Sequence, residues 1–200
     1  MALKIVVGLG NPGAKYRGTR HNLGFWALEE LGRRQGWPFR SEECDSRVAR
    51  GSLREIEVLL AEPQTYMNAS GGAVACLLET YGSGPEDLLV VCDDVALPLG
   101  MMRLRAAGSD GGHRGLRSIT EVLGTESFAR LRLGIGAGDE PLAEHVLAEF
   151  DSDQRALAVE AAARAAECLG TALSEGLEAA MNRYNRKPES GPPEPARGQA

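Results

Sequence analysis

The stretch from residue 3 to residue 22 constrains the fold of this chain more than any other. It opens with a short apolar run rich in β-branched residues, which is typical of a buried strand. The sequence GLGNPG then breaks the run, because glycines and a proline so close together force a tight turn. The turn carries Asn11, and the loop after it carries His21. Open α/β sheets bind ligands at polar loops beyond the carboxyl ends of strands, so we expect a site here.

Strand-like and helix-like patterns follow one another along the rest of the chain. Strands are expected at 47–53, 55–63, 87–95, 102–107 and 129–137, and helices at 23–34, 73–81, 116–124 and from 142 onward. This pattern predicts an α/β fold with a single domain, a twisted mixed β-sheet covered by helices on both faces. We expect residues 1–186 to form the domain and residues 187–200, rich in Pro, Gly and charge, to form a disordered tail.

Composition argues against a membrane protein and a metalloprotein. No apolar run approaches the ~20 residues that a bilayer-spanning helix needs, and no signal peptide is evident, so no membrane partner is expected. The cysteines at 44, 76, 92 and 168 lack the spacing of a metal site. They predict reduced thiols that pack as small apolar groups in a cytoplasmic protein.

The net charge of −6 is unevenly distributed along the chain. Residues 1–135 hold 16 basic and 16 acidic side chains, so residues 136–200 supply all of the excess acid. The window 101–135 holds 6 basic and 3 acidic side chains. A locally basic face on an acidic protein is compatible with this distribution, and composition alone does not decide whether the partner is a nucleic acid.

Four polar loops follow apolar strands and carry residue types that are used in acid–base catalysis. His21 and His113 lie in glycine-rich loops, and Asp93 and Asp94 end a buried strand. An imidazole suits general-base work near neutral pH, and a carboxylate on its other nitrogen fixes the tautomer. We expect one aspartate to serve His21 in this way and the other to cap a turn. His145 lies in a helical pattern beside glutamates and is expected at the surface or at an interface.

Amides and apolar side chains complete the candidate site. Asn11 and Asn68 either donate N–H groups to a developing oxyanion or stabilise turns. Tyr66 and Met67 either line an apolar wall or belong to the core. No G-x-S-x-G motif occurs, and no cysteine lies in a glycine-rich loop beside a histidine, so water activated by His21 is the simpler nucleophile.

Arginines alternate along two of the expected strands. Arg103 and Arg105 share one strand face, and so do Arg130 and Arg132. Such pairs form either a solvated sheet face or a clamp for phosphate, and a neighbouring catalytic loop favours the clamp.

The spacing Gly8-x-Gly10-x-x-Gly13 also matches the dinucleotide-binding fingerprint. That fingerprint needs a helix that opens at the last glycine. Here the next residues, AKYRGTRHN, are charged and lack apolar periodicity, and the helical pattern begins only near Asn22. A nicotinamide-dependent oxidoreductase is therefore kept as the alternative function, and an RNA-binding module without catalysis as a third.

Taken in their order, these motifs make the chain similar to the bacterial peptidyl-tRNA hydrolases. The resemblance runs from GLGNPGAKYRGTRHNLGF through PQTYMNASGG, VCDDVALPLG, GGHRGL and RLRLGIG to MNRYN. It implies hydrolysis of the ester between a peptide and the 3′ end of tRNA, which recycles tRNA from drop-off peptidyl-tRNA. It also implies a cytoplasmic monomer that binds tRNA and uses no metal and no cofactor.

The resemblance assigns a role to each matching residue. His21 is the family's general base, and Asp93 is the carboxylate that holds it basic. Asn68 would orient the carbonyl or the water, and Asn11 would distinguish N-blocked from free aminoacyl-tRNA. Contacts to the substrate are implied for a further set: Tyr16, Asn22, Tyr66, Met67, Asn68, Arg105, His113, Arg114 and Arg132.

Four positions in this match carry further expectations. Arg105 and Arg132 match the basic pair that grips the 5′ phosphate of the tRNA, in agreement with the locally basic window. Arg114 stands where the family usually has Asn, so a long cation replaces a neutral amide, and we keep it as a substrate contact that could bind phosphate. Ala96 stands where a second acid is common, and its loss could loosen the mouth of the crevice.

Overall fold

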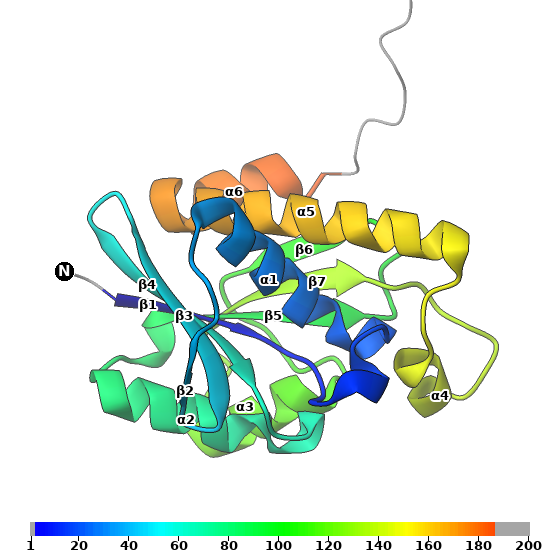
Figure 1. Cartoon of the computed structure of the whole chain (residues 1–200), viewed down its shortest axis with the longest axis horizontal. Coiled ribbons are helices and arrows are strands. Elements are labelled where there is room, and N and C mark those ends of the chain that lie inside the picture. The colour runs from blue at the N-terminus through cyan, green and yellow to red at the C-terminus, as the bar shows by residue number, and fades with distance from the viewer. Residues whose placement is uncertain (1–2, 187–200) are drawn as a thin grey trace, which may run out of the picture.

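The computed structural model, which describes residues 3–186, is built on a seven-stranded mixed sheet (Figure 1). Its strands are β1 (Leu3–Gly8), β2 (Ser41–Glu43), β3 (Ser46–Leu53), β4 (Ile56–Pro63), β5 (Leu88–Asp94), β6 (Met102–Arg105) and β7 (Ala129–Gly134). Its helices are α1 (Leu23–Gln35), α2 (Ser70–Tyr81), α3 (Arg114–Leu123), α4 (Leu142–Leu147), α5 (Ser152–Glu175) and α6 (Leu177–Tyr184), with short 3-10 helices η1 (Ala14–Tyr16), η2 (Arg20–Asn22), η3 (Met67–Ala69) and η4 (Pro85–Asp87). The tail expected at 187–200 lies outside the described residues.

Parallel strands form the centre of the sheet. The strand order is β2-β3-β4-β1-β5-β7-β6, in which β4, β1, β5 and β7 are parallel neighbours. The remaining strands, β2, β3 and β6, pair antiparallel at the two sides. The carboxyl ends of the four parallel strands therefore meet at one edge, which is where the sequence predicts a ligand site.

Helices cover both faces of the sheet, as the sequence predicts (Figure 1). One core lies between the sheet and helices α1, α5 and α6, and a second lies between the sheet and helices α2 and α3. Strand β1 is buried on both faces, with Val6 in the first core and Ile5 and Val7 in the second. Within residues 3–186, no helix combines the length and apolar character needed to cross a membrane.

Helix α1 lies unusually close to the end of β1. A Cβ atom at Gly24 would lie 2.6 Å from the carbonyl oxygens of Leu9 and Val91, and a Cβ at Gly8 would lie 2.6 Å from the carbonyl oxygen of Gly24. Glycine at both positions allows this approach, since any side chain would push the helix away from the strands. The helix ends at Gln35 and is capped by Gly36, which takes a left-handed conformation with φ of 71°.

The cysteine prediction is wrong for one pair. Cys44 and Cys76 form a disulfide that joins the turn between β2 and β3 to helix α2, with a Cα–Cα distance of 5.6 Å. The two residues are 32 positions apart, and neither spacing nor composition indicates that the turn packs on the helix. Cys92 and Cys168 are buried free thiols, as expected. The disulfide removes the cysteine pattern as an argument for a reducing compartment.

A buried carboxyl group near the end of β4 carries a strongly perturbed pKa. Glu62 is 0% exposed, and Arg47, its partner in the register of β3, lies 3.2 Å from Oε2. Burial, with a smaller effect of the nearby carboxylate of Glu29, raises the pKa of Glu62 to about 8, and the charge of Arg47 opposes this shift without cancelling it. Burial therefore costs more than the single ion pair returns.

Replacing Glu62 by Gln is expected to stabilise the protein more at about pH 9 than at about pH 5. The folded-state pKa of about 8 lies above the ordinary value of 4.5, so between these values the folded protein keeps a proton that the unfolded chain releases. The free energy of unfolding of the wild type falls as pH rises through this window, and the glutamine variant lacks that loss. Thermal unfolding should show the difference as several degrees in Tm, at about 2–4 °C per kcal/mol.

The matched control is Glu57→Gln, which changes an exposed glutamate on the same strand. Its effect on Tm should be nearly the same at both pH values. A gain in Tm for Glu62→Gln that is equal at both pH values would contradict the assignment of a raised pKa to this group.

Candidate active site

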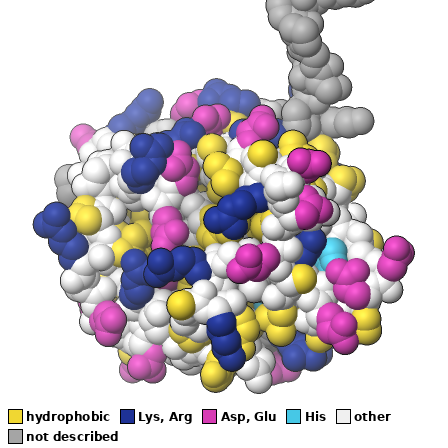
Figure 2. Space-filling view, turned by 45° about the vertical axis from the view of Figure 1, so that its right-hand side comes forward, with side chains coloured by type: hydrophobic (Ala, Val, Ile, Leu, Met, Phe, Trp, Pro, Cys, Tyr) yellow, Lys and Arg dark blue, Asp and Glu magenta, His cyan; other side chains and the backbone are white. Residues whose placement is uncertain are grey.

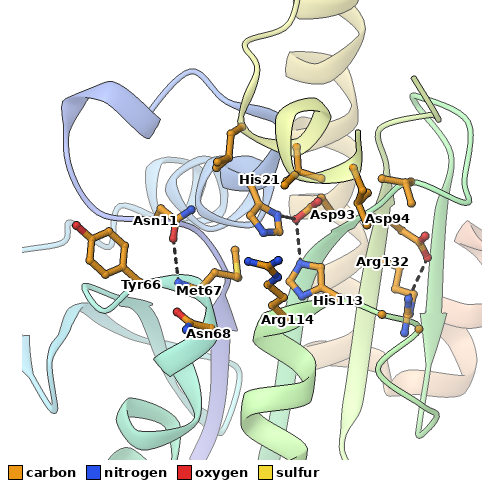
Figure 3. A pocket seen from close by; sticks show the side chains of 17 residues that line it. Asn11, His21, Tyr66, Met67, Asn68, Asp93, Asp94, His113, Arg114 and Arg132 are labelled. Atoms are coloured by element: carbon orange, nitrogen blue, oxygen red, sulfur yellow. Dashed lines mark hydrogen bonds and ion pairs between the residues drawn. The ribbon is translucent and has the colours of Figure 1, made fainter. Parts of the chain in front are cut away.

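A cleft of about 490 Å³ opens at the carboxyl edge of the parallel strands (Figure 3). The loops after β1, β4, β5 and β6 contribute to its lining, together with helix α4, which follows β7. The lining consists of Asn11, His21, Tyr66, Met67, Asn68, Asp93, Asp94, Val95, Gly111, Gly112, His113, Arg114, Arg132, Leu142, Ala143, Val146 and Leu147. Most of the candidate residues selected from the sequence therefore share one cavity.

Two imidazoles meet on a single carboxylate oxygen at the floor of the cleft. Oδ1 of Asp93 lies 2.8 Å from Nδ1 of His21 and 3.0 Å from Nε2 of His113 (Figure 3). Asp93 is buried at the end of β5, and the two histidine side chains are less than 10% exposed. An ionised carboxylate only accepts hydrogen bonds, so both ring nitrogens that face it are donors.

The other ring nitrogen of His113 has a structural task. His113 is the N-cap of α3, and its Nδ1 accepts the backbone N–H groups of Gly115 and Leu116 at 3.2 and 3.3 Å. A nitrogen that accepts these bonds carries no proton, so the ring is neutral and its proton lies on Nε2. His113 is therefore held at both nitrogens and has no free lone pair for a proton transfer.

His21 is held at one nitrogen, which makes it the base of the pair. Its Nδ1–H donates to Asp93, so the lone pair of the neutral ring lies on Nε2. Within residues 3–186 nothing hydrogen-bonds to this Nε2, and Figure 3 shows the ring projecting into the cleft. Burial alone would raise the pKa of Asp93, but the neighbouring imidazoles of His21 and His113 and their N–H bonds hold it well below its usual range. The carboxylate stays ionised and keeps the tautomer of His21 fixed.

Hydrogen bonds with Met67 and Asn22 fix the orientation of Asn11. The backbone N–H of Met67 donates to Oδ1 of Asn11 at 2.9 Å, so the oxygen faces η3 and the NH₂ group is directed to the cleft. The buried side chain of Asn22 holds the backbone of Asn11 at two points, accepting from its N–H at 2.9 Å and donating to its carbonyl at 3.0 Å. The amide of Asn11 is thus set in advance as a donor.

The structure separates the two aspartates. Asp93 is the one that bonds to His21, whereas Oδ1 of Asp94 accepts the backbone N–H of Ala96 at 2.8 Å and caps the turn after β5. Oδ2 of Asp94 also pairs with Arg132 at 3.1 Å. Ala96 itself is exposed in that turn, and the absence of an acid there leaves the His21–Asp93 pair intact.

The loop that delivers His113 differs from the expectation that each candidate loop leaves a strand at the same edge. Strand β6 is antiparallel to β7, so the chain leaves β6 at the opposite edge and must return across β7. Arg130, 1% exposed, donates to the carbonyls of Gly108 and Ser109, and Arg132 donates to Ser109 at 2.7 Å. The guanidinium of Arg130 is buried and uses its donors in these bonds, so it is not available to a phosphate. This contradicts the interpretation of its strand face as part of a phosphate clamp.

Helix α4 supplies an apolar wall that the sequence pattern did not single out. Leu142 and Leu147 remain 56% and 42% exposed at the cleft. Arg20, next to His21, fastens the following segment by donating to the carbonyl of Glu149 at 2.9 Å. His145 is 5% exposed and bonded to a carboxylate and a backbone carbonyl, so the expectation of a surface or interface position is wrong. Nothing in the local periodicity signals this wall, because its position depends on contacts distant in sequence.

Three candidate residues lie outside the cleft lining. Asn22 is buried behind Asn11, as described above. Tyr16 lies in η1 with Lys15 over its ring at 4.6 Å. Arg105 is exposed on the edge strand β6, diagonal to Arg132 across the β6–β7 pair.

The two histidines and Asp93 also form the one cluster in residues 3–186 with the composition of a metal site, their ligand atoms all within 4.8 Å of one another. Each nitrogen that faces Asp93 is already a hydrogen-bond donor, and Nδ1 of His113 is taken by α3. Apart from Nε2 of His21, the ring nitrogens of the two histidines are already used in hydrogen bonds. The absence of a metal requirement remains a prediction.

The fold and the site together define an α/β protein with a histidine–aspartate pair in a cleft at the carboxyl edge of its parallel strands. Comparisons with known proteins agree in detail. The profile of the family described as peptidyl-tRNA hydrolase matches residues 5–191. The peptidyl-tRNA hydrolase of Chloroflexus aggregans is 48% identical over 90% of this chain and 98% of that protein, and that of Dehalococcoides mccartyi is 44% identical over 92% and 100%.

Solved structures give the same result. The crystal structure of peptidyl-tRNA hydrolase from Acinetobacter baumannii aligns with a TM-score of 0.85 at 35% identity, covering 92% of this chain and 94% of that one. A complex of peptidyl-tRNA hydrolase with N-propanol aligns with a TM-score of 0.86 at 36% identity, covering 93% and 96%. The chain belongs to the peptidyl-tRNA hydrolase family.

The two active-site histidines should show opposite tautomers at neutral pH. Long-range ¹H–¹⁵N spectra are expected to place the ring proton of His113 on Nε2 and that of His21 on Nδ1, because of the bonds each ring makes. A His113→Asn variant, which keeps an N-cap side chain, identifies the signals of His113 by their loss. A proton found on Nδ1 of His113 would contradict the capping geometry.

Proposed function

We propose that this chain hydrolyses the ester that joins a peptide to the 3′ end of tRNA, with His21 as the general base. The observation that carries the proposal is the Nδ1–H of His21 bonded at 2.8 Å to the buried Asp93 inside a cleft, in a chain of the peptidyl-tRNA hydrolase family. The reaction releases free peptide and reusable tRNA. It therefore serves translation, by recovering tRNA from peptidyl-tRNA that leaves the ribosome early.

The proposed reaction begins with a water molecule bound to Nε2 of His21. As the water attacks the carbonyl carbon, its proton moves to Nε2, and the imidazolium is stabilised through its Nδ1–H by Asp93. The tetrahedral oxyanion accepts a hydrogen bond from the NH₂ group of Asn11, and Asn68, which lines the same cleft, orients the ester carbonyl or the water. When the intermediate collapses, the ribose oxygen leaves and takes the proton back from His21.

His113 acts as a positioning residue in this scheme. Its Nε2–H shares the oxygen of Asp93 that His21 uses, and its Nδ1 ties that contact to the first turn of α3. The carboxylate is therefore fixed from two sides, which keeps the ring of His21 in one orientation.

Neither alternative function is favoured. In the dinucleotide-binding fingerprint a helix opens at the third glycine, but α1 begins at Leu23, well after Gly13. Gly8 and Gly10 are explained by close packing, since a Cβ at Gly10 would lie 2.9 Å from the ring of Phe25. An RNA-binding module without catalysis would not need an oriented base in a cleft beside fixed amides.

Replacing His21 by Ala should lower kcat by roughly 10²–10⁴-fold, the usual contribution of a general base. The assay follows release of the N-acetylated amino acid from N-acetylaminoacyl-tRNA. Affinity for tRNA should change little, which separates loss of catalysis from loss of binding. Thermal unfolding checks that the variant, in which the buried Asp93 loses one hydrogen-bond donor, is still folded at the assay temperature. Turnover close to that of the wild type would refute the assignment of His21.

Recognition of the tRNA body is assigned to Arg105 and Arg132. On the face shown in Figure 2, basic side chains form separate groups with acidic ones between them, so a few placed arginines are a better candidate than a continuous basic surface. Arg105 is exposed, and Arg132 lies on the neighbouring strand with its guanidinium at the cleft. Arginine suits phosphate because its planar donors match the oxygens of the anion.

An Arg105→Ala variant is expected to bind tRNA several-fold more weakly and to show a salt dependence shallower by about one unit in the slope of log K against log salt. Arg40→Ala is the matched control, because Arg40 is equally exposed but precedes β2 at the opposite side of the sheet. Arg132→Ala is less clean, since it also frees Asp94 and Ser109. An unchanged slope for Arg105→Ala would remove this residue from the interface.

The remaining expectations concern the setting of the enzyme. We place it in the cytoplasm, where ribosomes produce its substrate, and expect it to act as a monomer without metal or cofactor. The proposed reaction supports this, since the base, the carboxylate and the amide donors all come from one chain.

A further inference from the structure

Arg114 occupies a distinctive place at the base of the cleft. It is the first residue of α3, and Figure 3 shows its side chain pointing up between Met67 and His113 toward His21. It also lines a second cavity of about 340 Å³ that runs along α3, and Asn68 borders both cavities with it. The guanidinium of Arg114 thus lies at the junction of the cleft and this α3 groove.

Close backbone packing fixes this junction. A Cβ atom at Gly115 would lie 2.6 Å from Sδ of Met67, so the first turn of α3 lies directly against η3. The hydroxyl of Ser118 accepts the backbone N–H of Gly71 at 3.0 Å and locks α3 to α2. The backbone of Arg114 is therefore held in place by close packing, and its side chain extends from this fixed point.

The charge of Arg114 has no partner among the described residues. Within residues 3–186 no hydrogen bond or ion pair holds its guanidinium, whereas Arg132 on the other side of the cleft is bonded to Asp94 and Ser109. One turn along α3, Arg117 lies 3.6 Å from Asp110, and Glu121 borders the same groove. The uncompensated positive charge at the junction therefore belongs to Arg114.

Two negative groups of a peptidyl-tRNA could pair with the guanidinium of Arg114: the transient oxyanion at the ester, or a permanent phosphodiester. Oxyanion stabilisation depends on donors held in place before the reaction, as Asn11 is by Met67. Arg114 is exposed and unfastened, so it would have to be ordered during the reaction. A phosphate is charged before and after the reaction, and an adaptable cation suits it well.

We propose that Arg114 binds the phosphodiester that precedes the terminal nucleotide, one ribose away from the scissile ester. This inference rests on the proposed function and adds a specificity residue to it. The contact is made equally in the ground state and the transition state, so it acts on KM and hardly on kcat. It would let the enzyme recognise the last internucleotide linkage of the RNA, separately from the grip of Arg105 on the tRNA body.

The test compares two short esters that differ in this phosphate. One is N-acetylaminoacyl adenosine, which has no phosphate, and the other is the same ester on the dinucleotide CpA, which has one. For Arg114→Ala we expect KM on the CpA ester to rise roughly 10-fold or more, as for loss of a charge-assisted bond, with kcat within about 3-fold. KM on the adenosine ester should not change. Arg114→Lys should recover part of the loss, and Arg117→Ala should behave as wild type.

Other outcomes overturn the proposal in recognisable ways. If Arg114→Ala lowers kcat equally on both esters, the guanidinium acts at the reacting carbonyl. If KM on the CpA ester is unchanged, the phosphate is not bound by Arg114. Should both short esters be too poor as substrates, the salt dependence of KM for N-acetylaminoacyl-tRNA decides, with a slope reduced by about 0.7 expected for Arg114→Ala and an unchanged slope overturning the idea. Failure of the wild type to cleave any of these esters would instead refute the proposed function.

Discussion

The Oδ1 atom of Asp93 accepts hydrogen bonds from two imidazoles that lie 72 and 20 residues away in the sequence. A buried carboxylate is costly unless it is paired and hydrogen-bonded, so the three groups must come together for the site to be stable at all. The position of His21 is set by the approach of α1 to β1, and that of His113 by the cap of α3. The hydrogen bonds to this one oxygen atom therefore join the segment before α1 and the segment before α3 to the end of β5.

Division of labour between the histidines follows from what each second nitrogen meets. In His113 that nitrogen is occupied by backbone N–H groups, and in His21 it faces the cleft. One histidine thus holds the carboxylate in place, and the other has a nitrogen that can accept a proton. The two side chains are almost equally buried, so the hydrogen bonds of the second nitrogen set the difference between them.

Local signals predicted much of this molecule. The strand before GLGNPG, the mixed sheet with helices on both faces, and a turn-capping role for one of the two aspartates all follow from patterns in the sequence. The segment that returns across β7, the wall made by α4 and the disulfide do not, because each is set by contacts between distant parts of the chain. Arg130 shows the difference: its spacing suggested a free strand face, and its burial depends on where a remote loop runs.

The glycines at the end of β1 bear on how motifs are interpreted. Gly8 and Gly24 let a helix touch a strand backbone to backbone, which is also one of the tasks of glycine in nucleotide-binding sheets. The shared pattern Gly-x-Gly therefore indicates close packing between a strand and a helix, and it does not identify the ligand. The pattern indicates a dinucleotide site only where a helix begins directly after the last glycine. In this chain α1 begins ten residues after Gly13, so the glycines serve packing alone.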